Sequence, residues 1–315
     1  MWTTQDIEAI YTLPLPDLIY RAQTIHREHH NANEVQFCTL ANIKSGNCSE
    51  DCSYCPQSAR YNTGIDIWQL PPLEEIQQQA RDAKANGSTR LCMGAAWREL
   101  KDNADFDHVI EMVKAVRNEG LEACVTLGML NDKQAKRLKE AGLTAYNHNI
   151  DTSPEYYPEI ITTRKFEDRL NTLEHVANAG LQVCCGGIVG LGETQHDRIR
   201  FIETLANLTP HPESVPINAL VPVEGTPLAG QPIVDPITLV RTIATARITM
   251  PTSRVRLSAG RTHMSDETQA LCFLAGANSI FTGDKLLTTA NPGEDQDHLL
   301  MQKLGLQVQK DLIPA

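Results

Sequence analysis

The chain has 315 residues, of which 41% are hydrophobic and 21% charged, and its formal net charge at pH 7 is −11. This composition is typical of a globular protein with a large core, and the length suits one α/β barrel with extensions. The acidic balance disfavours nucleic acid and anionic membranes as partners, and no apolar run reaches the roughly 18 residues of a transmembrane helix.

The predicted elements begin with an N-terminal helical extension over residues 1–33, interrupted at Leu13-Pro14-Leu15-Pro16. Residues 34–292 then alternate short apolar runs with amphipathic helical patterns. The predicted strands lie at 35–43, 88–94, 121–128, 143–150, 181–190, 214–220, 254–260 and 277–283. Eight strand–helix units predict a closed (β/α)8 TIM-type barrel of the α/β class, with an open doubly wound sheet as the alternative. Residues 293–315 are expected to form a C-terminal helix and tail.

The strongest motif is Cys48-Ser-Glu-Asp-Cys52-Ser-Tyr-Cys55, directly after the first predicted strand. This position predicts a loop at the carboxyl end of a barrel strand, where such barrels keep their active sites. Three thiolates can hold one metal centre and leave a position open, as catalytic metals require. A structural zinc site is the alternative, although no Cys or His follows Cys55 until Cys92. The N-terminus lacks the pattern of a secretory signal, so we expect a cytoplasmic protein with reduced cysteines.

Strand alternation places three further cysteines inside the barrel, namely Cys92, Cys124 and Cys184. Arg256 is predicted to point inward from another strand, and a buried guanidinium needs anionic partners such as thiolates on a metal cluster. The neighbouring Cys185 is expected to face the helices. Cys272 and Cys38 are interpreted as structural, although Cys38 has the parity to line the barrel.

The C-x3-C-x2-C spacing, with an aromatic residue before the third cysteine, resembles the signature of enzymes that generate radicals from S-adenosylmethionine (SAM). The strings GAAW (94–97), VRLSAGR (255–261) and GANSIF (276–281), among others, resemble the biotin synthase family over residues 34–292. This resemblance implies a [4Fe–4S] cluster with SAM on the loop cysteines Cys48, Cys52 and Cys55. It also implies a [2Fe–2S] cluster on the barrel residues Cys92, Cys124, Cys184 and Arg256.

The activity implied by the resemblance is conversion of dethiobiotin to biotin. Sulfur from the [2Fe–2S] cluster would be inserted by radical chemistry between C6 and C9, with two SAM per turnover. The implied partners are a second copy of the chain in a homodimer, a flavodoxin-type electron donor and iron–sulfur assembly proteins. Another radical SAM barrel enzyme and a non-catalytic metal-binding protein are the alternatives.

The resemblance also assigns contacts to the small molecules. Dethiobiotin would be bound by Asn147, Asn149 and Asn218, whose amides match the donors and acceptors of a neutral ureido ring. SAM would be bound by Tyr54, Asn149, Asp151, Arg169 and Ile188. Gly186 and Gly187 are expected to leave room for close approach of the backbone to SAM.

Overall fold

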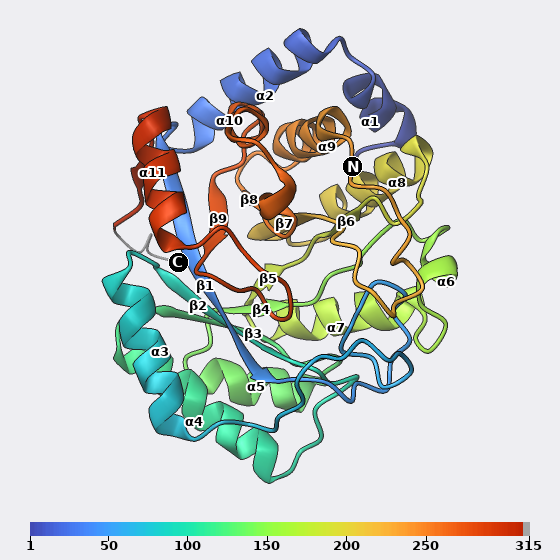
Figure 1. Cartoon of the computed structure of the whole chain (residues 1–315). Coiled ribbons are helices and arrows are strands. Elements are labelled where there is room, and N and C mark those ends of the chain that lie inside the picture. The colour runs from blue at the N-terminus through green and yellow to red at the C-terminus, as the bar shows by residue number, and fades with distance from the viewer. Residues whose placement is uncertain (311–315) are drawn as a thin grey trace.

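Parallel strands close into a barrel at the centre of the computed structural model, which describes residues 1–310 (Figure 1). The strands of the barrel are β1 (Glu34–Lys44), β2 (Arg90–Ala95), β3 (Glu122–Thr126), β4 (Ala145–Asn147), β5 (Gln182–Cys184), β6 (Gly187–Val189), β7 (Ser214–Ala219), β8 (Arg254–Leu257) and β9 (Ser279–Thr282). The hydrogen-bonded order is β1-β2-β3-β4-β5-β7-β8-β9, and β9 pairs with β1 to close the sheet. The strands β5 and β6 share one position, since both pair with β7. The predicted (β/α)8 TIM-type barrel is confirmed.

Helices cover the outside of this barrel between successive strands. They are α3 (Leu73–Ala85), α4 (Ala104–Asn118), α5 (Asp132–Glu140), α6 (Tyr157–Ile160), α7 (Phe166–Asn178), α8 (Gln195–Ala206), α9 (Pro236–Thr249) and α10 (Asp266–Leu274), with a short 3-10 turn at Arg261–His263. Their apolar sides pack on the outward face of the strands; Val109 and Val113 of α4 and Val125 of β3 are fully buried. This packing leaves alternate strand residues to point into the barrel.

Two helices precede the barrel, α1 (Thr4–Tyr11) and α2 (Leu15–His29). They lie along one side of the molecule and pack on α8, α9 and α10 (Figure 1). The chain breaks between them where the prolines predicted an interruption. In α2, His26 is buried and stacks on His30 with 5.3 Å between ring centroids. His30 in turn lies 2.9 Å from the Arg247 guanidinium, so this contact ties the N-terminal helices to α9.

The chain after β9 forms α11 (Glu294–Leu304) and then a short strand, β10 (Gln307–Val308). The strand pairs in parallel with Glu34 and Val35 at the start of β1. The sequence predicted the helix but not the strand, because two residues carry too little periodicity to identify one. The last residues of the predicted tail, 311–315, lie outside the described part of the chain. None of the helices within residues 1–310 has the length and apolar character that a membrane crossing requires.

Candidate active site

The inward side chains form layers along the barrel, because residues two apart on a strand face the same way. A polar layer comes first, at the amino ends of the strands, and includes Arg90 on β2, Glu122 on β3 and Gln182 on β5. Two residues further along the same three strands are the predicted cysteines Cys92, Cys124 and Cys184. In the strand register Cys92 lies directly beside Cys124. The barrel therefore gathers thiols from strands that are far apart in the sequence.

Four thiols meet in this second layer, one more than predicted. Cys38 of β1 is hydrogen-bonded to Cys92, Cys92 to Cys124, and Cys124 to Cys184. All four are at most 4% exposed, and we refer to them together as the barrel thiol cluster. Arg256 of β8 joins the cluster, with Nη2 3.2 Å from Cys38 Sγ. The structure thus brings together all four predicted barrel residues and adds Cys38, which was interpreted as structural.

Charge is unevenly distributed within the barrel thiol cluster. A hydrogen bond from Cys124 lowers the pKa of Cys184 to about 6, with help from Arg256 and against the effect of burial. Hydrogen bonds from Cys124 and Cys38 lower the pKa of Cys92 well below its ordinary value. Burial raises the pKa of Cys38, whereas hydrogen bonds to Cys184 and Cys92 raise that of Cys124. Because the thiolate is the form that binds metal, the lowered pKa values of Cys92 and Cys184 favour metal binding, whereas Cys38 and Cys124 would have to release a proton on binding.

Cys185 and Cys272 lie elsewhere. Both are fully buried in the main hydrophobic core that includes the barrel–helix interface, Cys185 next to β5 and Cys272 on α10. The expected outward orientation of Cys185 agrees with this placement, and strand alternation was enough to separate it from Cys184.

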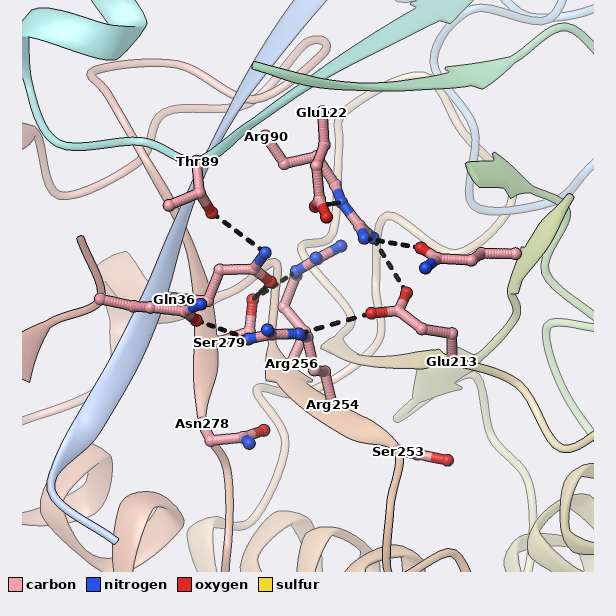
Figure 2. Close-up of polar contacts among 12 residues, drawn as sticks. Gln36, Thr89, Arg90, Glu122, Glu213, Ser253, Arg254, Arg256, Asn278 and Ser279 are labelled. Carbon is pink, nitrogen blue, oxygen red and sulfur yellow. Dashed lines mark hydrogen bonds and ion pairs between the residues drawn. The ribbon is translucent and has the colours of Figure 1, made fainter. Parts of the chain in front are cut away.

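A buried ionic network fills the layer before the barrel thiol cluster (Figure 2). Arg90 is fully buried and donates from Nε to Glu122 Oε2 at 2.8 Å and from Nη1 to Glu213 Oε2 at 3.1 Å. The other Glu213 oxygen lies 3.4 Å from Arg254 Nε. A buried guanidinium is stable only when such partners compensate its lost hydration. The amino end of the barrel is therefore filled by paired charges, and the opposite end carries the cysteine loop.

The loop cysteines follow β1 at its carboxyl end, as predicted. Gly46 and Asn47 just before Cys48 have φ of 73° and 56°, so the chain turns sharply as it leaves the strand. Burial is the main cause that raises the pKa of Cys48 and Cys52, and it raises that of Cys55 to about 12. Each thiol therefore has to release its proton as it binds a metal.

Two acidic residues between these cysteines anchor the loop. The Asp51 carboxylate accepts hydrogen bonds from the backbone N–H of Thr162 at 2.9 Å and of Thr163 at 3.1 Å. Burial alone would raise the pKa of Asp51, but these bonds and those from the two hydroxyls lower it to about 2. Glu50 is 2% exposed and lies 3.1 Å from Arg98. Neither anchor was predicted from the sequence, where the only signal was two adjacent acidic residues inside the motif.

The predicted SAM residues lie together beside this loop. Asp151 and Arg169 are close enough to Cys52 to influence its pKa. Arg169 Nη2 is 2.6 Å from Asp151 Oδ2, so two residues predicted to bind SAM are paired with each other. The backbone N–H of Ile188 donates to the Asp151 carbonyl at 2.8 Å. Burial, assisted by the Asp151 carboxylate, raises the pKa of Tyr54.

The three predicted amides lie at the carboxyl side of the barrel thiol cluster and are half-buried. Asn147 Nδ2 is 3.0 Å from Asn149 Oδ1 and 3.3 Å from Cys184 Sγ. Asn218 lies beside Ile188 in the strand register and donates to the Gly187 carbonyl at 2.9 Å. The amides thus link the barrel thiol cluster to the predicted SAM residues.

Gly186 lies in the break between β5 and β6, and Gly187 is the first residue of β6. A Cβ on Gly186 would lie 1.9 Å from the Pro216 carbonyl oxygen, and one on Gly187 would lie 2.4 Å from the Asp151 carbonyl oxygen. The expectation that these glycines leave room for SAM is wrong on the side where a Cβ would point, because the protein's own backbone fills it. Glycine is needed here for the barrel to close.

The donor set fits iron–sulfur clusters. Within residues 1–310, no three His, Cys, Asp or Glu side chains surround the position of a single metal ion. An iron–sulfur cluster needs a different arrangement, in which the thiolates are distributed over its iron atoms. Three loop thiols would leave one iron of a [4Fe–4S] cluster without a protein ligand. A (β/α)8 barrel with such a loop after its first strand defines the class of radical SAM enzymes.

Comparisons with known proteins agree with this class. The Radical SAM superfamily model matches residues 42–205, and the Biotin and Thiamin Synthesis associated domain matches residues 216–307. Biotin synthase of Synechococcus sp. (strain JA-3-3Ab) is 63% identical over 301 residues, or 96% of this chain and 97% of that protein. Biotin synthase of Cytophaga hutchinsonii is 59% identical over 306 residues, or 97% of this chain and 91% of that protein. The chain belongs to the biotin synthase family.

Solved structures with the same fold include more distant enzymes. Methylornithine synthase superposes with a TM-score of 0.82 at 20% identity, covering 98% of this chain and 94% of that one. The FeFe-hydrogenase maturase HydG from Carboxydothermus hydrogenoformans gives a TM-score of 0.82 at 18% identity, covering 98% of this chain and 76% of that one. At this level of identity the likeness concerns the fold.

Proposed function

We propose that the chain is a sulfurtransferase that converts dethiobiotin to biotin by radical insertion of sulfur between C6 and C9, with two SAM per turnover. The observation that carries the proposal is the barrel layer in which Cys92 and Cys184 lie close to Arg256 and Cys124 is hydrogen-bonded to both of these cysteines. Cleavage of SAM would use only the cluster on the loop cysteines and would not need a second cluster. Three further buried thiols with an arginine therefore support a second group inside the barrel.

Each set of ligands would hold one cluster. Cys48, Cys52 and Cys55 would hold a [4Fe–4S] cluster that also binds SAM, and Cys92, Cys124, Cys184 and Arg256 would hold a [2Fe–2S] cluster. When bound, these groups would supply the 5′-deoxyadenosyl radical that abstracts hydrogen and the sulfur that enters the product. The remaining tasks of the chain are to orient the substrate and to exclude water.

The substrate would lie between the loop and the barrel thiol cluster. Asn147, Asn149 and Asn218 each offer an amide donor and acceptor, which suits an uncharged ureido ring. Because Asn147 also contacts Cys184 Sγ at 3.3 Å, a ring bound by this amide would be held next to the barrel ligands. Asp151, Arg169, Tyr54, Ile188 and Asn149 would hold SAM on the other side.

The compartment and the partners follow from the same proposal. All nine cysteines are free thiols, which supports a reducing compartment such as the cytoplasm. A flavodoxin-type protein would deliver electrons to the loop cluster, and iron–sulfur assembly proteins would build both clusters. We also propose a homodimer, on the strength of the family resemblance.

The decisive experiment is anaerobic. The chain is reconstituted with iron and sulfide, supplied with dethiobiotin, SAM and a reductant, and its products are analysed by mass spectrometry. Biotin together with methionine and 5′-deoxyadenosine is expected. SAM cleavage without biotin would overturn the substrate and favour another radical SAM barrel enzyme. Absence of cleavage by a chain shown to carry its [4Fe–4S] cluster, or zinc without acid-labile sulfide, would favour a non-catalytic metal-binding protein.

Two variants separate the roles of the clusters. Cys52→Ala should abolish SAM cleavage, because the loop then lacks a ligand. Cys184→Ala should keep the loop cluster and stop biotin formation. Cys272→Ala is the matched control, since this thiol is equally buried but lies on α10 outside both sites. Normal biotin formation by the Cys184 variant would show that this residue is not a ligand.

A further inference from the structure

Cys38 has a place in the barrel that its interpretation as a structural residue does not explain. Its side chain is fully buried on β1, with Sγ 3.2 Å from Arg256 Nη2 and 3.8 Å from Ser279 Oγ. It is also hydrogen-bonded to Cys92, a proposed cluster ligand. A cysteine that only fills space would need none of these polar neighbours.

The barrel layer therefore holds five donors for one cluster. A [2Fe–2S] cluster takes four protein ligands, and thiolates are the usual ones. The guanidinium of Arg256 carries a proton on each nitrogen and is a poor ligand until it loses one. Arg256 Nη2 lies 3.2 Å from Cys38 Sγ, so an iron bound by Arg256 would also be within reach of Cys38.

Arg256 has partners of its own outside the barrel thiol cluster. Its Nε donates to Ser279 Oγ at 3.0 Å, and its guanidinium lies 4.7 Å from the centre of the Phe281 ring. A guanidinium released from iron would keep these contacts and would not become an unpaired buried charge. The exchange of Arg256 for another ligand is therefore open to this chain without rearrangement of the barrel.

We propose that Cys38 is an alternative fourth ligand of the barrel iron–sulfur cluster, able to take the iron position that Arg256 otherwise fills. This inference rests on the proposed function, since it requires a cluster at Cys92, Cys124 and Cys184. In the exchange the Cys38 thiol gives up one proton and the departing guanidine takes up one. The total charge of the site is unchanged, which keeps the exchange compatible with a buried location.

The test compares reconstituted full-length chains: wild type, Cys38→Ser, Arg256→Met and the double variant. Iron and acid-labile sulfide are counted, and the barrel cluster is observed by Mössbauer and visible spectroscopy. We expect each single variant to retain the barrel cluster, and Arg256→Met to give the spectrum of a cluster with thiolate ligands only. The double variant should lose the cluster to a chelator roughly tenfold faster or more. Removing even the groups that orient metal ligands weakens metal binding by about that factor.

The matched control is Arg256→Met combined with Cys272→Ala, which removes a buried thiol away from the barrel thiol cluster. Equal cluster retention in this control and in the Cys38→Ser double variant would overturn the inference. If the double variant does not fold, as judged by circular dichroism, Arg256→Met alone decides: a spectrum that retains a nitrogen or oxygen ligand on the cluster would equally overturn it. A wild-type chain with a loop cluster but no barrel cluster would refute both the proposed function and this inference.

Discussion

Arg90 Nε lies 2.8 Å from Glu122 Oε2, and each of these residues stands two positions before a cysteine of the barrel thiol cluster on the same strand (Figure 2). Side chains two apart face the same way, so the ion pair lies one layer from Cys92 and Cys124. The pair spans β2 and β3 and fixes their relative position at the level next to the proposed cluster.

Removing Glu122 should destabilise the chain strongly. Arg90 is fully buried, and Glu122→Ala would leave it with Glu213 and Gln182 as its remaining partners. Loss of one partner from a buried ion pair lowers the free energy of unfolding by about 3–5 kcal/mol. Because two other partners of Arg90 remain, we expect a loss near the lower end of this range. Urea denaturation of the metal-free chain measures it.

The control for this prediction is Glu119→Ala, which removes the exposed pair with Arg81, whose side chain is 48% exposed. Its effect should stay within about 0.5 kcal/mol, since exposed ion pairs contribute little. Similar losses in the two variants would contradict a special role for the buried pair.

The second prediction concerns the loop that carries Cys48, Cys52 and Cys55. Asp51→Asn weakens the hydrogen bonds that join this loop to Thr162 and Thr163. We expect the chain to fold but to lose loop iron to a chelator roughly 10–100-fold faster, as happens when groups that orient metal ligands are removed. Asp66→Asn, at an exposed site further along the loop, should behave as wild type. Unchanged iron release in the Asp51 variant would show that the loop does not depend on this anchor.

Much of the barrel could be predicted from the sequence, because the side-chain directions along a strand depend only on neighbouring residues. Alternation of side-chain directions along LQVCC separates Cys184, which is hydrogen-bonded to Cys124, from Cys185, which lies in the main hydrophobic core. The same rule gave Cys38 the parity to face inward. It did not reveal that Cys38 lies against Arg256, because these residues are 218 positions apart and their distance depends on how the barrel closes.

Contacts between segments that are far apart in the sequence could not be predicted for a related reason. Asp51 meets Thr163 across 112 positions, and Asp151 meets Arg169 across a helix and a loop without any shared pattern. The break of the fifth strand at Gly186 was also missed, since a glycine pair is equally compatible with ligand approach and with backbone crowding. Such features are decided by packing in three dimensions.

The third prediction is a loss of stability in mild acid. Burial, followed by the positive charge of Arg247, lowers the pKa of His26 to about 3, with His30 and Arg27 adding to the effect. The ordinary value is about 6.5, so the unfolded chain binds more protons between these limits. The stability that neutral His26 contributes is therefore complete above about pH 6.5 and declines as the pH falls, by up to about 1.4 kcal/mol per pH unit.

His26→Gln should flatten this part of the profile, as measured by urea denaturation between pH 4.5 and 7.5, a window of about three units around the ordinary histidine pKa. His211→Gln, at an exposed position, provides the comparison and should leave the slope unchanged. An identical slope in wild type and the His26 variant would mean that this residue does not cause the acid sensitivity.

The last prediction compares two glycines of the same chain. A Cβ on Gly186 would lie 1.9 Å from the Pro216 carbonyl oxygen, whereas a Cβ on Gly230 would have no atom within 4 Å. Gly186→Ala should lower the free energy of unfolding by more than ordinary overpacking does, which is about 1–3 kcal/mol, because the obstacle is backbone that cannot rotate away. Gly230→Ala should be neutral or stabilising by up to about 1 kcal/mol.

The effect of Gly186→Ala should extend to the proposed substrate site if enough protein folds to be studied. The Gly186 N–H donates to Asn149 Oδ1 at 3.1 Å, and Asn149 in turn accepts from Asn147. A shift of this backbone would move both amides, so dethiobiotin binding measured by calorimetry should weaken more than SAM cleavage by the loop. Equal stability of the two alanine variants would contradict the crowding at Gly186. Intact dethiobiotin binding in a destabilised Gly186 variant would show that the amides keep their positions when the closing of the barrel is disturbed.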